Sequence, residues 1–165
     1  MEFNKQHFWP DNQQLINKND DGCTNILLPV VTGSNVFAII TDINIATANF
    51  IVDNLSKGEK WNLLLAINPG GATRQDVLYL LEELQAKNQS VISIRVILPR
   101  MLREQTLNVN LALFGKNDGE YWLNIGSTPS FGIKTALEGT ANLLFKPDSA
   151  VLEQCRRFID LHWEL

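Results

Sequence analysis

The segment from Leu107 to Ser127 runs LNVNLALF, then GKNDG, then EYWLNIGS. Apolar residues alternate with asparagine or alanine in its first part, which is the period of a β-strand with one buried face. The pentapeptide Gly115–Gly119 contains Asn-Asp-Gly, whose residues tolerate the positive φ angles of a tight turn. The sequence therefore predicts a β-hairpin with Asn108 and Asn110 side by side on one strand and the Ser127 hydroxyl at the exit of the other.

Strand and helix patterns alternate around this hairpin. A polar stretch over residues 1–25 predicts an irregular N-terminal arm, and residues 26–31, which include Pro29, predict an edge strand or an extended segment. Apolar runs predict four further strands, and apolar residues at helical spacing predict a helix after each of the first two. Asp148 is expected to cap a final helix. We expect these strands over residues 36–41, 61–67, 91–98 and 141–146. The order of elements predicts one α/β domain over residues 26–165 with a mixed sheet.

Composition and net charge limit the classes of protein to which this chain can belong. The 165 residues are 45% hydrophobic and 19% charged, which suits one globular domain with a single core. A net charge of −4 disfavours a protein that binds nucleic acid through an overall basic surface, although lysines and arginines can cluster on one face. Cys23 and Cys155 are far apart, which favours reduced thiols and a cytoplasmic protein. No apolar run is long enough to span a bilayer, so no membrane association is expected.

The hairpin resembles the core of the phospholipase D superfamily, in its bacterial nuclease and restriction-endonuclease-like branch with a single motif. That signature is His-x-Lys on one strand and Gly-Ser-x-Asn after the next. Here Asn108-Val109-Asn110 and Gly126-Ser127-Thr128-Pro129 stand at these positions, and Glu138 resembles the downstream acidic residue. The resemblance covers roughly residues 36–165. It implies a phospholipase D-like α/β/α sandwich with a mixed central sheet.

The departures from the signature bear on activity. In active members the histidine attacks phosphorus and the lysine stabilises the phosphoryl oxygens. An asparagine amide is neither nucleophilic nor charged, so the resemblance implies a catalytically degenerate domain. The residual motif positions Ser127 and Glu138 are the candidate catalytic residues. The candidate ligand-binding residues are Asn108, Asn110, Arg100, Arg103 and Lys134.

The resemblance leads to two hypotheses about function. A third interpretation is that the chain is an unrelated α/β domain. The first is a non-catalytic module for dimerisation or for binding a partner or nucleic acid, within a restriction or defence-type protein. The second is an active phosphodiesterase or nuclease in which Ser127 and Glu138 converge with His7 or His162. Active members combine two motif copies, so the single copy implies a homodimer. We expect no cofactor and no metal ion, and the apolar helical ending is typical of a domain with further chain after Leu165.

Overall fold

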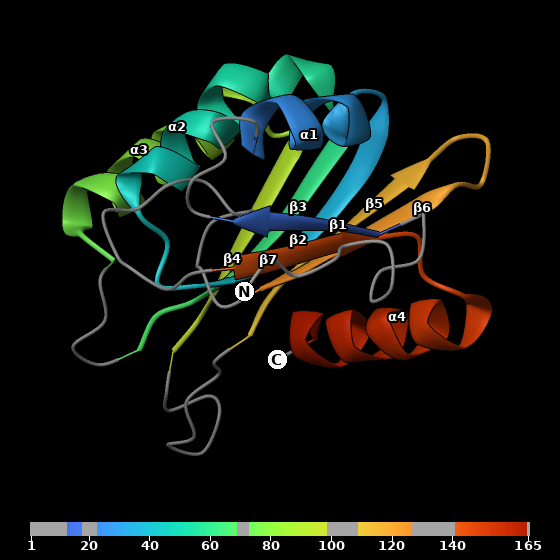
Figure 1. Cartoon of the computed structure of the whole chain (residues 1–165). Helices are drawn as coiled ribbons and strands as arrows, with labels where there is room; N and C mark the ends of the chain where they lie inside the picture. The colour runs from blue at the N-terminus through green and yellow to red at the C-terminus, as the bar shows by residue number, and fades with distance from the viewer. Residues whose placement is uncertain (1–12, 18–22, 69–72, 99–108, 127–140, 165) are drawn as a thin grey trace, which may run out of the picture.

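The computed structural model describes residues 13–17, 23–68, 73–98, 109–126 and 141–164. They form a seven-stranded sheet in the order β1-β7-β6-β5-β2-β3-β4, with helices on both faces (Figure 1). The elements are β1 (Gln13–Asn17), α1 (Cys23–Val31), β2 (Ser34–Thr41), α2 (Ile45–Asn54), the 3-10 turn η2 (Leu55–Lys57), β3 (Lys60–Ala66), α3 (Gln75–Lys87), β4 (Ile92–Ile97), β5 (Asn110–Lys116), β6 (Tyr121–Gly126), β7 (Ala141–Phe145) and α4 (Ser149–Trp163).

The sheet is mixed, as the sequence predicts. Strands β2, β3 and β4 are parallel, and the helices α2 and α3 connect them. Strands β5, β6, β7 and β1 pair antiparallel to one another, and β5 also pairs antiparallel with β2. Strand β2 therefore joins a parallel half of the sheet to an antiparallel half. The α/β class and the strands expected at 36–41, 61–67, 91–98 and 141–146 are confirmed.

Helices α1, α2 and α3 lie over one face of the sheet, and α4 lies over the other (Figure 1). Each face has its own apolar cluster. Ala112 and Phe114 of β5 belong to the cluster under α1, α2 and α3. Leu111 and Leu113 of the same strand pack with Ile159 of α4. The prediction of one buried face for this strand was therefore wrong, because helices cover both sides of the sheet at β5.

The first quarter of the chain differs from its prediction. Strand β1 lies inside the segment expected to be irregular, and α1 replaces the expected edge strand. Leu27, Val30 and Val31 follow the i, i+3, i+4 spacing of a helix and are all buried. Burial of this stripe outweighs the presence of Pro29 inside the helix. None of the described helices is long and apolar enough to cross a membrane.

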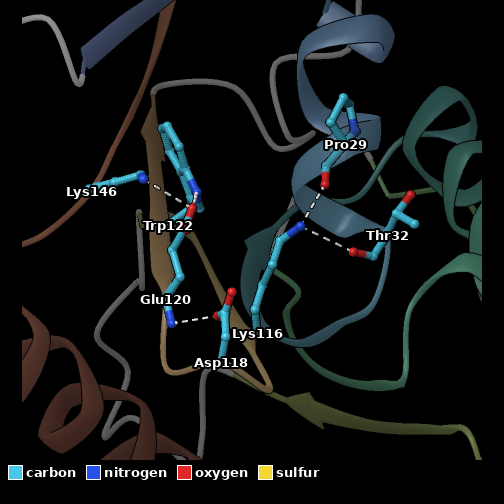
Figure 2. Close-up of polar contacts among 7 residues, drawn as sticks. All are labelled: Pro29, Thr32, Lys116, Asp118, Glu120, Trp122 and Lys146. Atoms are coloured by element: carbon cyan, nitrogen blue, oxygen red, sulfur yellow. Dashed lines mark hydrogen bonds and ion pairs between the residues drawn. The ribbon is translucent and has the colours of Figure 1, made fainter.

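The hairpin is tied to its neighbours through polar side chains, and Figure 2 shows these contacts. Lys116 Nζ donates hydrogen bonds to the carbonyl oxygens of Pro29 (2.9 Å) and Thr32 (3.3 Å), which lie at the C-terminal end of α1. The Glu120 carboxylate accepts from the Trp122 indole N–H and pairs with Lys146 at 3.2 Å. These contacts connect the β5–β6 turn to α1 and to the end of β7.

Helix α4 is amphipathic and covers its face of the sheet with a narrow apolar stripe. The Asp148 carboxylate accepts from the Val151 backbone N–H at 2.8 Å, so the predicted cap is confirmed. Cys155 and Ile159 are buried against the sheet. At the other end of α4, the Arg95 side chain of β4 donates to the Trp163 carbonyl oxygen and lies over the Trp163 ring. Both ends of the helix are thus anchored.

Two substitutions in α4 test this packing. Ile159→Ala should lower the free energy of unfolding by about 2–5 kcal/mol, because it removes buried methyl groups and leaves a cavity. Leu161→Ala should change it by less than about 0.5 kcal/mol, because Leu161 is 65% exposed. Urea denaturation of the two variants measures both values. Similar losses for the two variants would contradict the assignment of the buried face.

The buried thiol makes stability depend on pH. Burial raises the pKa of Cys155. Its contribution to stability is therefore complete below the thiol pKa of the unfolded chain, about 8.5, and is lost as pH rises through the higher pKa of the folded state. As pH rises from about 7 to about 9.5, the free energy of unfolding should fall more for the wild type than for Cys155→Ala. Cys23 is present in both proteins, so its titration does not contribute to the difference. Equal losses would show that Cys155 titrates normally.

Candidate functional site

The candidate site lies at the end of the sheet where β2, β3 and β4 finish and β5 begins, which we call the carboxyl end. The strand register places Thr41, Ala66 and Ile97 beside one another there. Ligands of open α/β sheets bind outside the carboxyl ends of the parallel strands, because the loops that follow those strands meet there. The polar residues of this end are therefore the first to consider as a site.

Asn110 is bound to the end of β2. Its Oδ1 atom accepts the backbone N–H of Thr41 at 2.9 Å. The Thr41 hydroxyl donates to the Val109 carbonyl oxygen at 2.9 Å and accepts from the Val109 N–H at 3.2 Å. These side-chain bonds continue the β2–β5 pairing beyond its last backbone pair, Ile39 with Leu111. Because a backbone N–H can only donate, the carboxamide oxygen of Asn110 has a structural role and the amide nitrogen is the group this side chain can offer to a ligand.

Asp42 follows β2 with a left-handed backbone, at a φ of 51°. It is the one non-glycine residue with positive φ among those the structure describes. Its carboxylate accepts from the Asn68 backbone N–H at 3.2 Å and from Asn68 Nδ2 at 3.4 Å. This contact connects the loop after β2 to the loop after β3. Left-handed backbone at a residue with a side chain costs free energy and is concentrated at functional sites, so Asp42 and Asn68 belong to the candidate site.

Most residues that the sequence analysis selected lie outside the described residues. Among the candidate catalytic and ligand-binding residues, Asn110 is the exception. The others belong to two segments, residues 99–108 and 127–140. The described residues that flank the first segment are Leu98 and Val109, and those that flank the second are Gly126 and Ala141. Pairing of Asn110 with Gly126, and of Gly126 with Asn142, puts these borders at the carboxyl end too. The selected residues without a described position are Arg100, Arg103, Asn108, Ser127, Lys134 and Glu138.

Sequence reasoning missed Thr41, Asp42 and Asn68. It expected only residues at helical spacing after the strand at 36–41, whereas α2 begins at Ile45 and Asn44 is its cap, with Asn44 Oδ1 accepting the Thr47 N–H at 2.9 Å. Two features in the sequence point to them. Asp42 directly follows an apolar strand, and Asn68 comes shortly after the next one.

The described histidine has a packing role. His162 Nδ1 lies 2.8 Å from the Phe158 carbonyl oxygen, and its ring contacts the Phe158 ring with centroids 4.2 Å apart. His7 lies outside the described residues. Within the described ranges, no group of three or more His, Cys, Asp or Glu side chains could hold a metal ion.

No protein-family model matches the chain, and no curated protein matches it. The resemblance to phospholipase D-like nucleases therefore stays a prediction.

Three substitutions at Asp42 separate the effect of its backbone conformation on stability from the effect of its carboxylate. Asp42→Ala should be less stable than Asp42→Gly by about 1 kcal/mol, because both lose the bonds from Asn68 and only alanine is strained at positive φ. Asp42→Asn should lose least, because asparagine tolerates this conformation and keeps an accepting oxygen. Urea denaturation orders the three. An alanine variant as stable as the glycine variant would contradict the left-handed assignment.

Proposed function

We propose that this chain is a catalytically degenerate phospholipase D-like domain, which binds a partner or ligand at the carboxyl end of its sheet without cleaving it. The proposal rests on the asparagine substitutions in the motif and on the geometry of the one motif asparagine that the structure describes. The α/β architecture, with helices on both faces of a mixed sheet, is compatible with this family and with others.

The position of Asn110 is the observation that carries the proposal. In the family a lysine at this position directs its ammonium group to the phosphoryl oxygens, where positive charge stabilises the transition state. Asn110 is uncharged, and its Oδ1 is bound to the Thr41 backbone N–H at 2.9 Å. The side chain thus stabilises the pairing of β2 with β5 instead of supplying charge to a substrate.

The charges of the residues that the structure describes around this end also disfavour phosphodiester chemistry. Asp42 brings a carboxylate to the carboxyl end, where a phosphate would be repelled. Arg74, at the start of α3, is held by Asp76 through two hydrogen bonds from its guanidinium. At the described residues a bound partner would therefore be recognised by hydrogen bonds to uncharged groups such as the Asn110 amide nitrogen more than by attraction to positive charge. Binding of that kind depends weakly on salt.

A homodimer is part of the same proposal. Family members with one motif copy pair across a two-fold axis, which would bring two carboxyl ends together and double the set of amides offered to a partner. Light scattering of the purified chain should then give twice the mass of the 18.6 kDa monomer. A monomeric mass would remove the dimer from the proposal and leave the binding role to be tested by itself.

The absence of turnover is the direct test. The wild-type chain should not hydrolyse bis(p-nitrophenyl) phosphate or fluorescently labelled single- and double-stranded DNA above the rate without protein, because a nucleophile and a cation are replaced by amides. Ser127→Ala and Glu138→Ala should give the same rates as the wild type, after circular dichroism has shown that each variant is folded.

Turnover that Ser127→Ala or Glu138→Ala abolishes would overturn the proposal in favour of a phosphodiesterase with non-standard residues. The same labelled DNA also tests binding by fluorescence anisotropy. Affinity that falls steeply with salt would show that phosphate contacts dominate, which contradicts recognition by uncharged groups.

A further inference from the structure

A hollow lies at the ends of β2 and β5 opposite the carboxyl end. It has a volume of about 400 Å³, and β2, β5, β6 and α4 line it. Gly115 on its floor is five residues along β5 from Asn110, which corresponds to about 17 Å of strand. The volume falls within the range of small-molecule sites. This hollow, which we call the α4 pocket, is distinct from the candidate site above.

The floor of the α4 pocket is built around a glycine. Gly115 and Tyr121 face each other across the β5–β6 pair. A Cβ atom on Gly115 would lie 2.6 Å from Cε1 of the Tyr121 ring, so glycine is needed for the ring to lie this close to β5. On α4, the Arg156 guanidinium lies over the same ring, 4.7 Å from its centroid. Gly115 and Arg156 together position the tyrosine ring at the wall of the pocket.

An aromatic ring from β2 is left open to the pocket. Phe37 lies two residues from Ile39 and on the same face of the strand, yet Phe37 is 37% exposed while Ile39 is 1% exposed. Both residues lie on the side of the sheet that α4 covers. An exposed phenyl ring that lines a hollow is a surface on which a planar ring can stack.

Charged groups of both signs surround these rings. Arg156 and Asp160 line the pocket from the same face of α4, four residues apart. Lys116 also lines it, and its Nζ is held by the carbonyl oxygens of Pro29 and Thr32 (Figure 2). Because those carbonyl oxygens lie at the end of α1, on the other face of the sheet, the charged groups that the pocket offers a ligand are the Arg156 guanidinium and the Asp160 carboxylate. An anionic group is favoured near Arg156, and Asp160 can accept hydrogen bonds from an amine.

We propose that the α4 pocket binds a small planar aromatic molecule that carries both an anionic group and an amine. The ring stacks on Phe37, the anionic group pairs with Arg156 and the amine donates to Asp160. Purine nucleotides and aromatic amino acids share this chemistry. The proposal does not depend on the function of the carboxyl end, because no residue of that end lines the pocket.

Arg157 supplies a matched control for Arg156. It is the next residue on α4, but its Nε donates to Glu153 Oε1 at 2.9 Å and it does not line the pocket. Arg156→Gln and Arg157→Gln change the net charge equally, and both side chains are exposed. A difference in ligand binding between the two variants therefore reports the position of the charge and not its amount.

The experiment titrates the full chain with adenosine 5′-monophosphate and with L-tryptophan, followed by two-dimensional amide NMR. At least one probe should bind with a Kd of about 1 mM or lower. Amide signals of Phe37, Gly115 and Tyr121 should shift, and those of Thr41 and Asn68 should not. Arg156→Gln should weaken binding about tenfold, and Arg157→Gln should leave it within about twofold. Adenosine, which lacks the phosphate, should bind the wild type and Arg156→Gln equally.

The two probes distinguish the sources of the ligand. Binding of the nucleotide alone would assign the pocket to nucleotides, and binding of tryptophan alone would assign it to amino acids. The proposal is overturned if neither probe binds with a Kd of about 1 mM or lower, if both arginine variants weaken binding equally, or if the shifts occur at Thr41 and Asn68. Thermal unfolding of each variant shows that a loss of binding is not a loss of fold.

Discussion

The pairing of β2 with β5 is the constraint on which the rest of the structure depends. Strand β2 is parallel to β3 on one side and antiparallel to β5 on the other, so this single boundary joins the two halves of the sheet. Its residues alternate between the two apolar clusters, with Ala38 and Ile40 on one side and Ile39 on the other. Both helical layers are therefore held through the same strand. A one-residue shift of its register would move every β2 side chain at this boundary to the other face.

The strands were predictable because their composition leaves few alternatives. Trp61 and Leu63–Ala66 are almost entirely buried, and an apolar run of this length fits a strand covered on both faces. Helix α1 was not predictable in the same way, because Pro29 and the shortness of the run favour an extended segment locally. Its helical state depends on the burial of Leu27 and Val31 against the sheet, which is a tertiary contact that no local pattern contains.

The same distinction holds for the candidate site. The position of Asn110 on a hairpin strand follows from the local alternation of residues, but its partner Thr41 lies 69 residues earlier in the chain. The Asp42 carboxylate is bound by Asn68, which lies in the loop after β3, 26 residues later. The types of residue in a site can thus be listed from the sequence, whereas their hydrogen-bond partners are set by the sheet order. In the α4 pocket, too, Gly115 and Arg156 meet on Tyr121 from different elements.

The pairing of β1 with β7 has a consequence for the order in which the protein is assembled on the ribosome. Gln13 pairs with Phe145 and Asn17 with Ala141, so a strand synthesised before β2–β6 waits for one synthesised after them. Until β7 emerges, β1 has no partner strand, while β2, β3 and β4 can already pair with their neighbours in sequence. Closure of so long a loop is slow and its entropic cost is large. During synthesis the nascent chain therefore exposes an unpaired strand that is available to chaperones or to another copy of the chain.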